Sequence, residues 1–282
     1  MSSLAGFRST LETSRQSALA SAVARTQMQI STGKRLQSAS DDPAAAARIG
    51  QLARVAADVD SWSANIGLAK SLTSQADTVL AHMSDQMTRV QELYVSAGNP
   101  ALSASDRQSV ALELRAIADD LDVMAATRNS LGQPLFAQLP SQPDQIPVGD
   151  GLSVEPAPSA HQLFIHDGVG LSDQIRAAAD SLAVADPVAR KSQYQGWLTT
   201  LDGLASHVAQ AHADLGVRAQ QIDQISDRLA RQKLDVAVER SGLEDTDIGE
   251  AVARLNSQQL TLEAAQAAFA RIHKRSLFDL LS

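Results

Sequence analysis

Histidines and neighbouring carboxylates are the residues of this sequence whose side chains could do chemistry near neutral pH. His207 and His212 stand five positions apart, and because a helix brings residues three or four apart onto one face, they are poorly placed to hold one metal ion. His161 and His166 with Asp167 could form an acid–base group, but they fall in a stretch expected to be an exposed loop. Neither set predicts a metal or catalytic site.

Other signatures of enzymes are missing from the sequence. It contains no G-x-S-x-G, no phosphate-binding P-loop and no dinucleotide-binding glycine pattern. It also contains no cysteine, so neither disulfides nor thiolate sites can form. We therefore predict no enzymatic activity and no cofactor, although an intracellular helical scaffold or enzyme remains the alternative of a different class.

Composition limits the partners. The net charge of −8 and the isoelectric point near 5.2 argue against a nucleic-acid or anionic-membrane surface, which needs concentrated positive charge. No apolar run approaches the roughly 18 residues of a membrane helix, and charges interrupt the first thirty residues, unlike a cleaved secretion signal. Aromatic residues are 3% of the chain against 44% hydrophobic residues, which favours long, thin helical packing.

Residues 31–49 indicate the end of one helix and the start of the next. Gly33 suits the left-handed residue that ends a helix, and Lys34 and Arg35 suit the negative carboxyl end of that helix. Asp41 and Asp42 can accept hydrogen bonds from the first backbone N–H groups of a new helix, with proline next in the chain. The prediction is a helix, a short linker, and a long helix from Pro43 to about Ser96.

Apolar residues recur at helical spacing along the rest of the chain. In the long helix the predicted seam is Leu68, Leu72, Ala76, Val79, Met83, Met87, Val90 and Tyr94. A turn is expected at 98–100, and Ser103 and Asp106 can form a capping box at the start of the next helix. We expect that helix to end near Leu131 and Gly132. Its predicted inward residues are Val110, Leu114, Ile117, Leu121 and Met124. The two helices should lie antiparallel.

The middle of the chain differs from the rest in amino-acid composition. Six of the nine prolines fall between Pro134 and Pro158, and IPVG and LSVE are the extended-looking runs there. We predict a small, exposed, irregular or β-hairpin insertion, followed by a short helix over Leu171 to Leu182.

Asp186 and Pro187 predict the start of another long helix, and the clearest apolar periodicity of the chain follows them. Its seam is Leu201, Leu204, Val208, Ala211, Leu215, Arg218, Ile222, Ile225, Leu229, Gln232 and Val236, in which the arginine and glutamine are expected to fix register. After a break at 242–247, Asp247 and Glu250 can cap a last helix with the seam Leu255, Leu262, Ala265, Phe269 and Ile272.

The predicted fold class is all-α: an elongated bundle of long antiparallel helices with terminal coiled-coil helices and a small β-containing insertion. The predicted segments are an amino-terminal assembly helix and linker (1–41), rod helices (42–136), the insertion (137–170), rod helices (171–241) and a carboxyl-terminal assembly helix (242–282). The terminal helices cannot bury their apolar stripes alone, so we expect them to pair with copies of themselves. The predicted interface residues are Leu4, Phe7, Leu11, Leu255, Leu262, Phe269, Ile272, Leu277 and Phe278.

Several motifs, taken in order, resemble the flagellin family. STGKR (31–35) is followed by Ser-Asp-Asp-Pro-Ala (40–44), while ATRNSLGQPLFA (126–137) and the terminal SLFDLLS (276–282) are similar to the hook-associated members of that family. The resemblance covers roughly 16–137 and 202–282, with a looser similarity around 145–156. It implies a secreted structural protein of the bacterial flagellum at the junction of hook and filament, with a short filament flagellin as the alternative.

The same resemblance implies partners and a location. The implied partners are neighbouring copies in an axial ring or helix, the first hook-associated protein, flagellin and a flagellar export chaperone. Export would use the flagellar type III route to the cell exterior, and the terminal segments would be largely unfolded before assembly.

Overall fold

The structure, a computed structural model, describes residues 2–138, 145–184 and 186–278, and the side chains of 10–271 within those ranges. The chain divides into two compact units. The first, Asp58–Gln232, we call the four-helix unit; the second, Met1–Ala57 with Lys233–Ser282, we call the terminal unit. Helices α2 (Pro43–Ala97) and α6 (Pro187–Glu244) contribute to both units.

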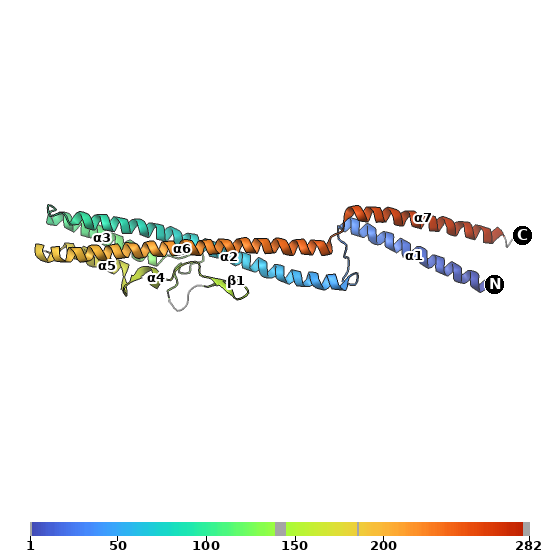
Figure 1. The fold of residues 1–282 in the computed structure, drawn as a ribbon, viewed down its shortest axis with the longest axis horizontal. Coiled ribbons are helices and arrows are strands. Elements are labelled where there is room, and N and C mark those ends of the chain that lie inside the picture. The colour runs from blue at the N-terminus through green and yellow to red at the C-terminus, as the bar shows by residue number, and fades with distance from the viewer. Residues whose placement is uncertain (1, 139–144, 185, 279–282) are drawn as a thin grey trace. The chain divides into compact units, whose positions relative to one another are not determined.

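The four-helix unit is named for the helices that enclose its core: α2, α3 (Ala104–Ala125), α5 (Leu171–Leu182) and α6 (Figure 1). Cross-helix pairs show that neighbours run antiparallel. Across α2 and α3, Arg89 lies 2.7 Å from Glu113 and His82 lies 3.7 Å from Asp120. Across α3 and α5, Arg115 lies 2.6 Å from Asp180 and Arg176 lies 2.7 Å from Asp119. In each pair the residue numbers rise on one helix as they fall on the other. This confirms the predicted all-α fold class and its antiparallel long helices.

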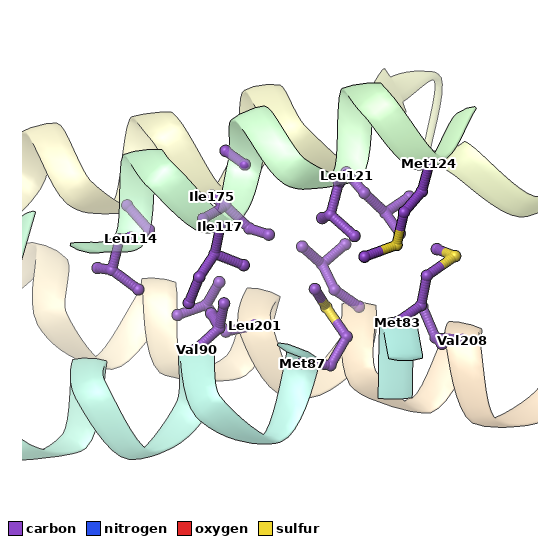
Figure 2. Close-up of a cluster of buried hydrophobic side chains, with 14 of the residues drawn as sticks. Met83, Met87, Val90, Leu114, Ile117, Leu121, Met124, Ile175, Leu201 and Val208 are labelled. Atoms are coloured by element: carbon purple, nitrogen blue, oxygen red, sulfur yellow. The ribbon is translucent and has the colours of Figure 1, made fainter. Parts of the chain in front are cut away.

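The core of the four-helix unit draws on all four helices (Figure 2). Met83, Leu114, Leu204 and Val208 are fully buried, and Tyr94 is buried with its hydroxyl 2.8 Å from that of Ser181. The predicted seams of α2, α3 and α6 are therefore confirmed over most of their length. Leu68 is the exception in α2, because 40% of its surface is exposed.

The insertion is built from two small hairpins around a short helix. Strands β1 (Ile146–Gly149) and β2 (Leu152–Val154) pair antiparallel, as do β3 (Ile165–His166) and β4 (Val169–Gly170), with α4 (Ala160–Phe164) between the hairpins. The two predicted strands are confirmed.

The expectation that this insertion is exposed is wrong. Val148 and Val154 are buried in one cluster with Ile222, Ile225 and Leu229 of α6. Arg218, a polar member of the α6 seam, lies 3.0 Å from Glu155 of the insertion. The polar seam residue therefore binds the insertion to α6, a role that periodicity alone does not reveal.

Two of the predicted helix caps are confirmed. Ser103 and Asp106 form the capping box of α3, and Asp42 Oδ1 accepts the backbone N–H of Ala45 at the start of α2. However, α3 ends at Ala125 rather than near Leu131. Beyond it the chain turns back on itself, because Leu135 N–H donates to Thr127 O and the Asn129 side chain accepts the N–H groups of two later residues in the same turn.

In the terminal unit, helices α1 (Ser2–Thr32) and α7 (Ile248–Phe278) lie side by side (Figure 1). Gly33 has the predicted left-handed backbone, with φ +68°, directly after α1. Ala45 and Leu52 of α2 are buried in this unit, and Arg48 binds Glu239 of α6 through two contacts of 2.6 and 3.0 Å.

Candidate assembly surface and the joint beside it

Each terminal helix presents a seven-residue repeat to its partner. In α7 the inward positions, spaced alternately by four and three residues, are Ala251, Leu255, Gln258, Leu262, Ala265 and Phe269; the first is buried and the rest are half-buried. In α1 the inward positions with the same spacing are Glu12, Gln16, Leu19, Val23, Thr26 and Ile30, of which only Thr26 is buried. This alternation is the geometry of a coiled-coil seam.

Polar side chains occupy part of that seam. The Thr26 hydroxyl lies 2.9 Å from the Gln258 side-chain amide, and Thr26 is 3% exposed. The Nε2 atom of Gln16 is buried and has no hydrogen-bond partner in the described part of the chain. Polar side chains at seam positions stabilise a helix pair less than apolar ones would.

A second face of each helix remains uncovered. Leu11 and Met28 of α1 are 44% and 55% exposed. On α7, Ile248, Val252 and Leu260 are 46%, 40% and 69% exposed. Such exposed apolar side chains on paired helices mark a surface that further helices can cover.

The predicted interface residues divide into three groups. Leu255, Leu262 and Phe269 lie on the half-buried face of α7, which packs against α1. Leu11 lies on the uncovered face of α1 rather than on the face that meets α7. Leu4, Phe7, Ile272, Leu277 and Phe278 belong to α1 and α7, but their side chains fall outside the described ones.

Sequence reasoning missed Thr26, Gln258 and Ala251 because they are polar or small. Their spacing could have identified them, because the seven-residue repeat in α1 is regular when polar positions are counted together with apolar ones.

Two chain segments meet beside this pair of helices: residues 33–35, after α1, and residues 244–246, before α7. We call their contact the joint. Arg35 N–H donates to Glu244 O at 2.7 Å, and Thr246 N–H donates to Gly33 O at 2.8 Å, so Lys34 and Asp245 form an antiparallel bridge.

Side chains reinforce the joint. The Arg35 guanidinium donates to Leu243 O at 2.9 Å and lies 3.7 Å from Asp42, while Lys34 Nζ lies 3.4 Å from Glu244. Hydrogen bonds from Arg240 and Lys34 hold the pKa of the Glu244 carboxyl below its usual range. Lys34 and Arg35 therefore serve the carboxyl end of α6 rather than that of α1, which corrects the prediction for them.

Asp41 has a different role from the one predicted. Its carboxylate accepts the backbone N–H groups of Gln37 and Ser38 at 3.1 and 2.9 Å, so it shapes the linker instead of capping α2. Asp42 alone caps that helix.

The histidines that the sequence offered as chemical candidates, His161, His166, His207 and His212, belong to the four-helix unit. His212 lies 3.0 Å from Asp77, whereas the ring of His207 contacts that of His166, with centroids 4.9 Å apart. His161 is exposed, as predicted. His166 was also predicted to be exposed, but its side chain is only 29% exposed. Within the described ranges no group of three or more potential ligands could hold a metal ion, and no helix is long and apolar enough to cross a membrane.

The chain belongs to the flagellin family. Residues 8–140 match the bacterial flagellin N-terminal helical region, and residues 198–281 match the C-terminal helical region. The two matches contain most of α1, α2, α3 and α7.

Individual relatives come from two branches of that family. Flagellar hook-associated protein 3 from Escherichia coli K12 and from Salmonella typhimurium are 25% and 27% identical, each over 89% of this chain and 90% of the relative. A flagellin from Listeria innocua is 22% identical over 85% of this chain and 84% of its own length.

Solved structures share the fold. A structure from Vibrio parahaemolyticus assigned to a flagellar hook-associated protein has a TM-score of 0.66 at 20% identity, covering 73% of this chain and all of its own. The flagellar junction protein from Legionella pneumophila has a TM-score of 0.55 at 15% identity, covering 71% of this chain and all of its own.

Proposed function

We propose that this protein is the structural adaptor between hook and filament in the bacterial flagellum, exported to the cell exterior without acting as an enzyme. The observation that carries the proposal is the similarity to hook-associated protein 3 over nine-tenths of both chains. The uncovered apolar faces of α1 and α7 support it, because a single chain leaves Leu260 and Met28 in water.

The proposed partners follow from that position. Copies of the chain associate through α1 and α7 in an axial ring, in which the predicted interface residues contact neighbouring subunits. The first hook-associated protein lies on one side of this ring and flagellin on the other. A flagellar chaperone holds the carboxyl-terminal part before type III export.

A short filament flagellin is the second candidate, favoured by the similarity to the Listeria flagellin. The two functions differ in what a deletion strain releases. A strain without a junction protein builds hooks and sheds flagellin into the medium, whereas a strain without its flagellin builds hooks and sheds none.

Electron microscopy of the deletion strain, with an immunoblot of the medium for flagellin, tests the proposal. Bare hooks with abundant shed flagellin are expected, and the full-length gene should restore filaments. Bare hooks with no flagellin in the medium would favour the second candidate, and normal filaments would contradict both.

A further inference from the structure

An exposed leucine stands on a tightly bonded turn after α3. Leu131 is 68% exposed, although it is a large apolar residue. The Asn129 side chain accepts the backbone N–H groups of two residues in this turn, at 2.9 and 3.0 Å. The Arg128 guanidinium donates to Gly132 O across the same turn, at 2.7 Å. Because these bonds hold residues 126–133, which we call the Leu131 turn, in one shape, little conformational entropy is lost when Leu131 binds a partner.

A hollow lies between α2 and α6 of the four-helix unit. Its volume is about 310 Å³, and its apolar lining consists of Leu215, Ala219 and Ile222 of α6. Apolar cavities of roughly 150 Å³ already hold a benzene molecule, which is larger than the side chain of leucine. The hollow can therefore take a leucine side chain together with part of the backbone that carries it.

The Leu131 turn and the hollow carry charges of opposite sign. The turn contains one basic residue, Arg128, and no acidic one. The hollow is lined by the carboxylates of Asp77 and Asp223 and by the ammonium group of Lys70. Asp223 lies 2.9 Å from Lys70 and Asp77 lies 3.0 Å from His212, but the two carboxylate side chains are 68% and 61% exposed and can meet a further cation. With histidine counted as neutral, charge favours an approach of the turn to the hollow.

The turn and the hollow lie on opposite sides of α2 at nearly the same level. Asn129 of the turn lines a second pocket together with Leu68 and Leu72 of α2. The residues of α2 that line the hollow are Lys70, Thr73, Ser74 and Asp77. At 3.6 residues per turn, these two sets stand on opposite sides of the helix, and their centres are about one turn apart along it. The turn of one copy can therefore reach the hollow of a second copy that lies beside it.

A contact of this kind is heterologous, because one copy contributes the turn and the next contributes the hollow. Such contacts repeat around a ring when the rotation closes and along a helix when it does not. One leucine and one arginine bury far less than the roughly 1,200 Å² of a stable protein complex. We therefore expect the free chain to remain a monomer, with the contact forming only where other surfaces already hold copies side by side.

We propose that the Leu131 turn of one copy docks into the hollow between α2 and α6 of the next copy. Leu131 then covers the apolar lining formed by α6, and Arg128 faces the carboxylates of Asp77 and Asp223. This inference rests on the proposed function, because it assigns a second contact, made by the four-helix unit, to copies that associate through α1 and α7.

Cysteine cross-linking in isolated flagella tests the proposal, and the chain has no native cysteine to interfere. Leu131→Cys with Ala219→Cys is expressed in a strain that lacks the native gene, and its flagella are treated with copper phenanthroline. Because each chain then carries one cysteine in the turn and one in the hollow, disulfides should join chains into dimers and higher multimers. Each single variant should give no multimers.

The matched control pairs the same hollow position with another exposed residue. Val123→Cys with Ala219→Cys places the first cysteine on α3, where Val123 is 69% exposed. This control should not cross-link. Equal cross-linking of both pairs would overturn the proposal, and so would dimers of the Leu131→Cys single variant, which would show that two turns meet each other.

Substitutions on the two sides of the contact give an independent test. Leu131→Asp should reduce the amount of chain in flagella by about tenfold relative to Leu131→Met, because the burial of one leucine is lost. Ala219→Phe fills the hollow and should cause a similar loss. The combined variant should assemble no worse than either one alone, since both remove the same contact. Parent-like amounts of Leu131→Asp in flagella, or losses that add, would overturn the proposal.

The parent chain separates this inference from the proposed function. If the parent chain is absent from flagella, the proposed function fails and the inference fails with it. If the Leu131→Cys, Ala219→Cys chain is present in flagella without forming multimers, the inference alone is overturned.

Discussion

Helices α2 and α6 contribute to both units of this molecule, and the same kind of helix is buried very differently in each. In the four-helix unit a helix such as α2 meets neighbours on several sides, so Leu80, Met83 and Tyr94 lose all contact with water. In the terminal unit α1 and α7 have mainly each other, and their seam residues beyond Thr26 and Ala251 stay half-exposed. The difference shows that long amphipathic helices specify a fold only where enough of them surround a common core.

The contrast predicts that the same substitution has effects of very different size in the two units. Leu204→Ala removes a fully buried side chain from the four-helix unit and should lower the free energy of unfolding by about 2–5 kcal/mol. Leu260→Ala, on the 69% exposed position of α7, should change it by less than about 0.5 kcal/mol. Urea unfolding followed by circular dichroism measures both, and equal effects would remove the distinction between the units.

The insertion gives a second test of how strongly burial stabilises the four-helix unit, because it lies within that unit. Replacing residues 146–154 by a Gly-Ser linker removes the burial of Val148 and Val154, at about 1.5–3 kcal/mol each. Thermal unfolding should shift downward by roughly 10 °C, as measured by calorimetry. Ser153→Ala, at an exposed position of β2, is the control, and an unchanged Tm for the linker variant would mean that the insertion adds no core.

A smaller effect is expected where α2 ends. A Cβ on Gly98 would lie 2.2 Å from the Tyr194 hydroxyl oxygen, whose ring stacks on Tyr94 with centroids 5.3 Å apart. Gly98→Ala should therefore cost about 1–3 kcal/mol by overpacking. Gly67→Ala, inside α2 with open space around it, should instead stabilise by about 0.5–1 kcal/mol. The sign difference in chemical denaturation is the test, and two values of the same sign would contradict it.

The smallest predicted effect is one of pH. Hydrogen bonds from the side chain and then the backbone of Ser103 lower the pKa of the Asp106 carboxyl. A carboxyl whose pKa is lower in the folded chain stabilises it above the unfolded pKa, and that contribution is lost as pH falls through the folded pKa. Asp106→Asn should lower the Tm at neutral pH, and the gap to the parent should close as the pH falls below the ordinary pKa range of an aspartate carboxyl. A gap that persists in acid would assign the loss to something other than the charge.

Much of the four-helix unit could be predicted from the sequence because caps and seams there are local and apolar. Pro187, Ser103 and the seam from Leu201 to Leu229 all lie where periodicity and capping chemistry place them. The early end of α3 could not be predicted, because it depends on backbone hydrogen bonds between Thr127 and Leu135 across a turn.

The candidate surface was only partly predictable. Leu255, Leu262 and Phe269 stand out as apolar positions of α7, but the partner face of α1 contains Glu12, Gln16 and Thr26. Leu11, the one predicted interface residue of α1 whose side chain the structure describes, lies on the uncovered face instead. The joint could not be predicted from the sequence, because its hydrogen bonds connect backbone atoms of segments some 210 residues apart.

Assembly through α7 is the central claim, and a double substitution tests it most directly. Leu262→Asp with Phe269→Asp places two carboxylates in the α7 seam that packs against α1, and so breaks the helix pair whose uncovered face copies of the chain are proposed to share, at a cost that includes both lost burial and desolvation. Leu262→Met with Phe269→Leu keeps the seam apolar and serves as the control.

The measurement is the recovery of each variant in the medium and in isolated flagella, together with the thermal transition of the purified chain. The aspartate variant should be secreted but absent from flagella, with the transition of the four-helix unit unchanged, while the control variant assembles. An aspartate variant that is found in flagella, or one that loses the transition of the four-helix unit, would contradict the claim that the last helix serves assembly.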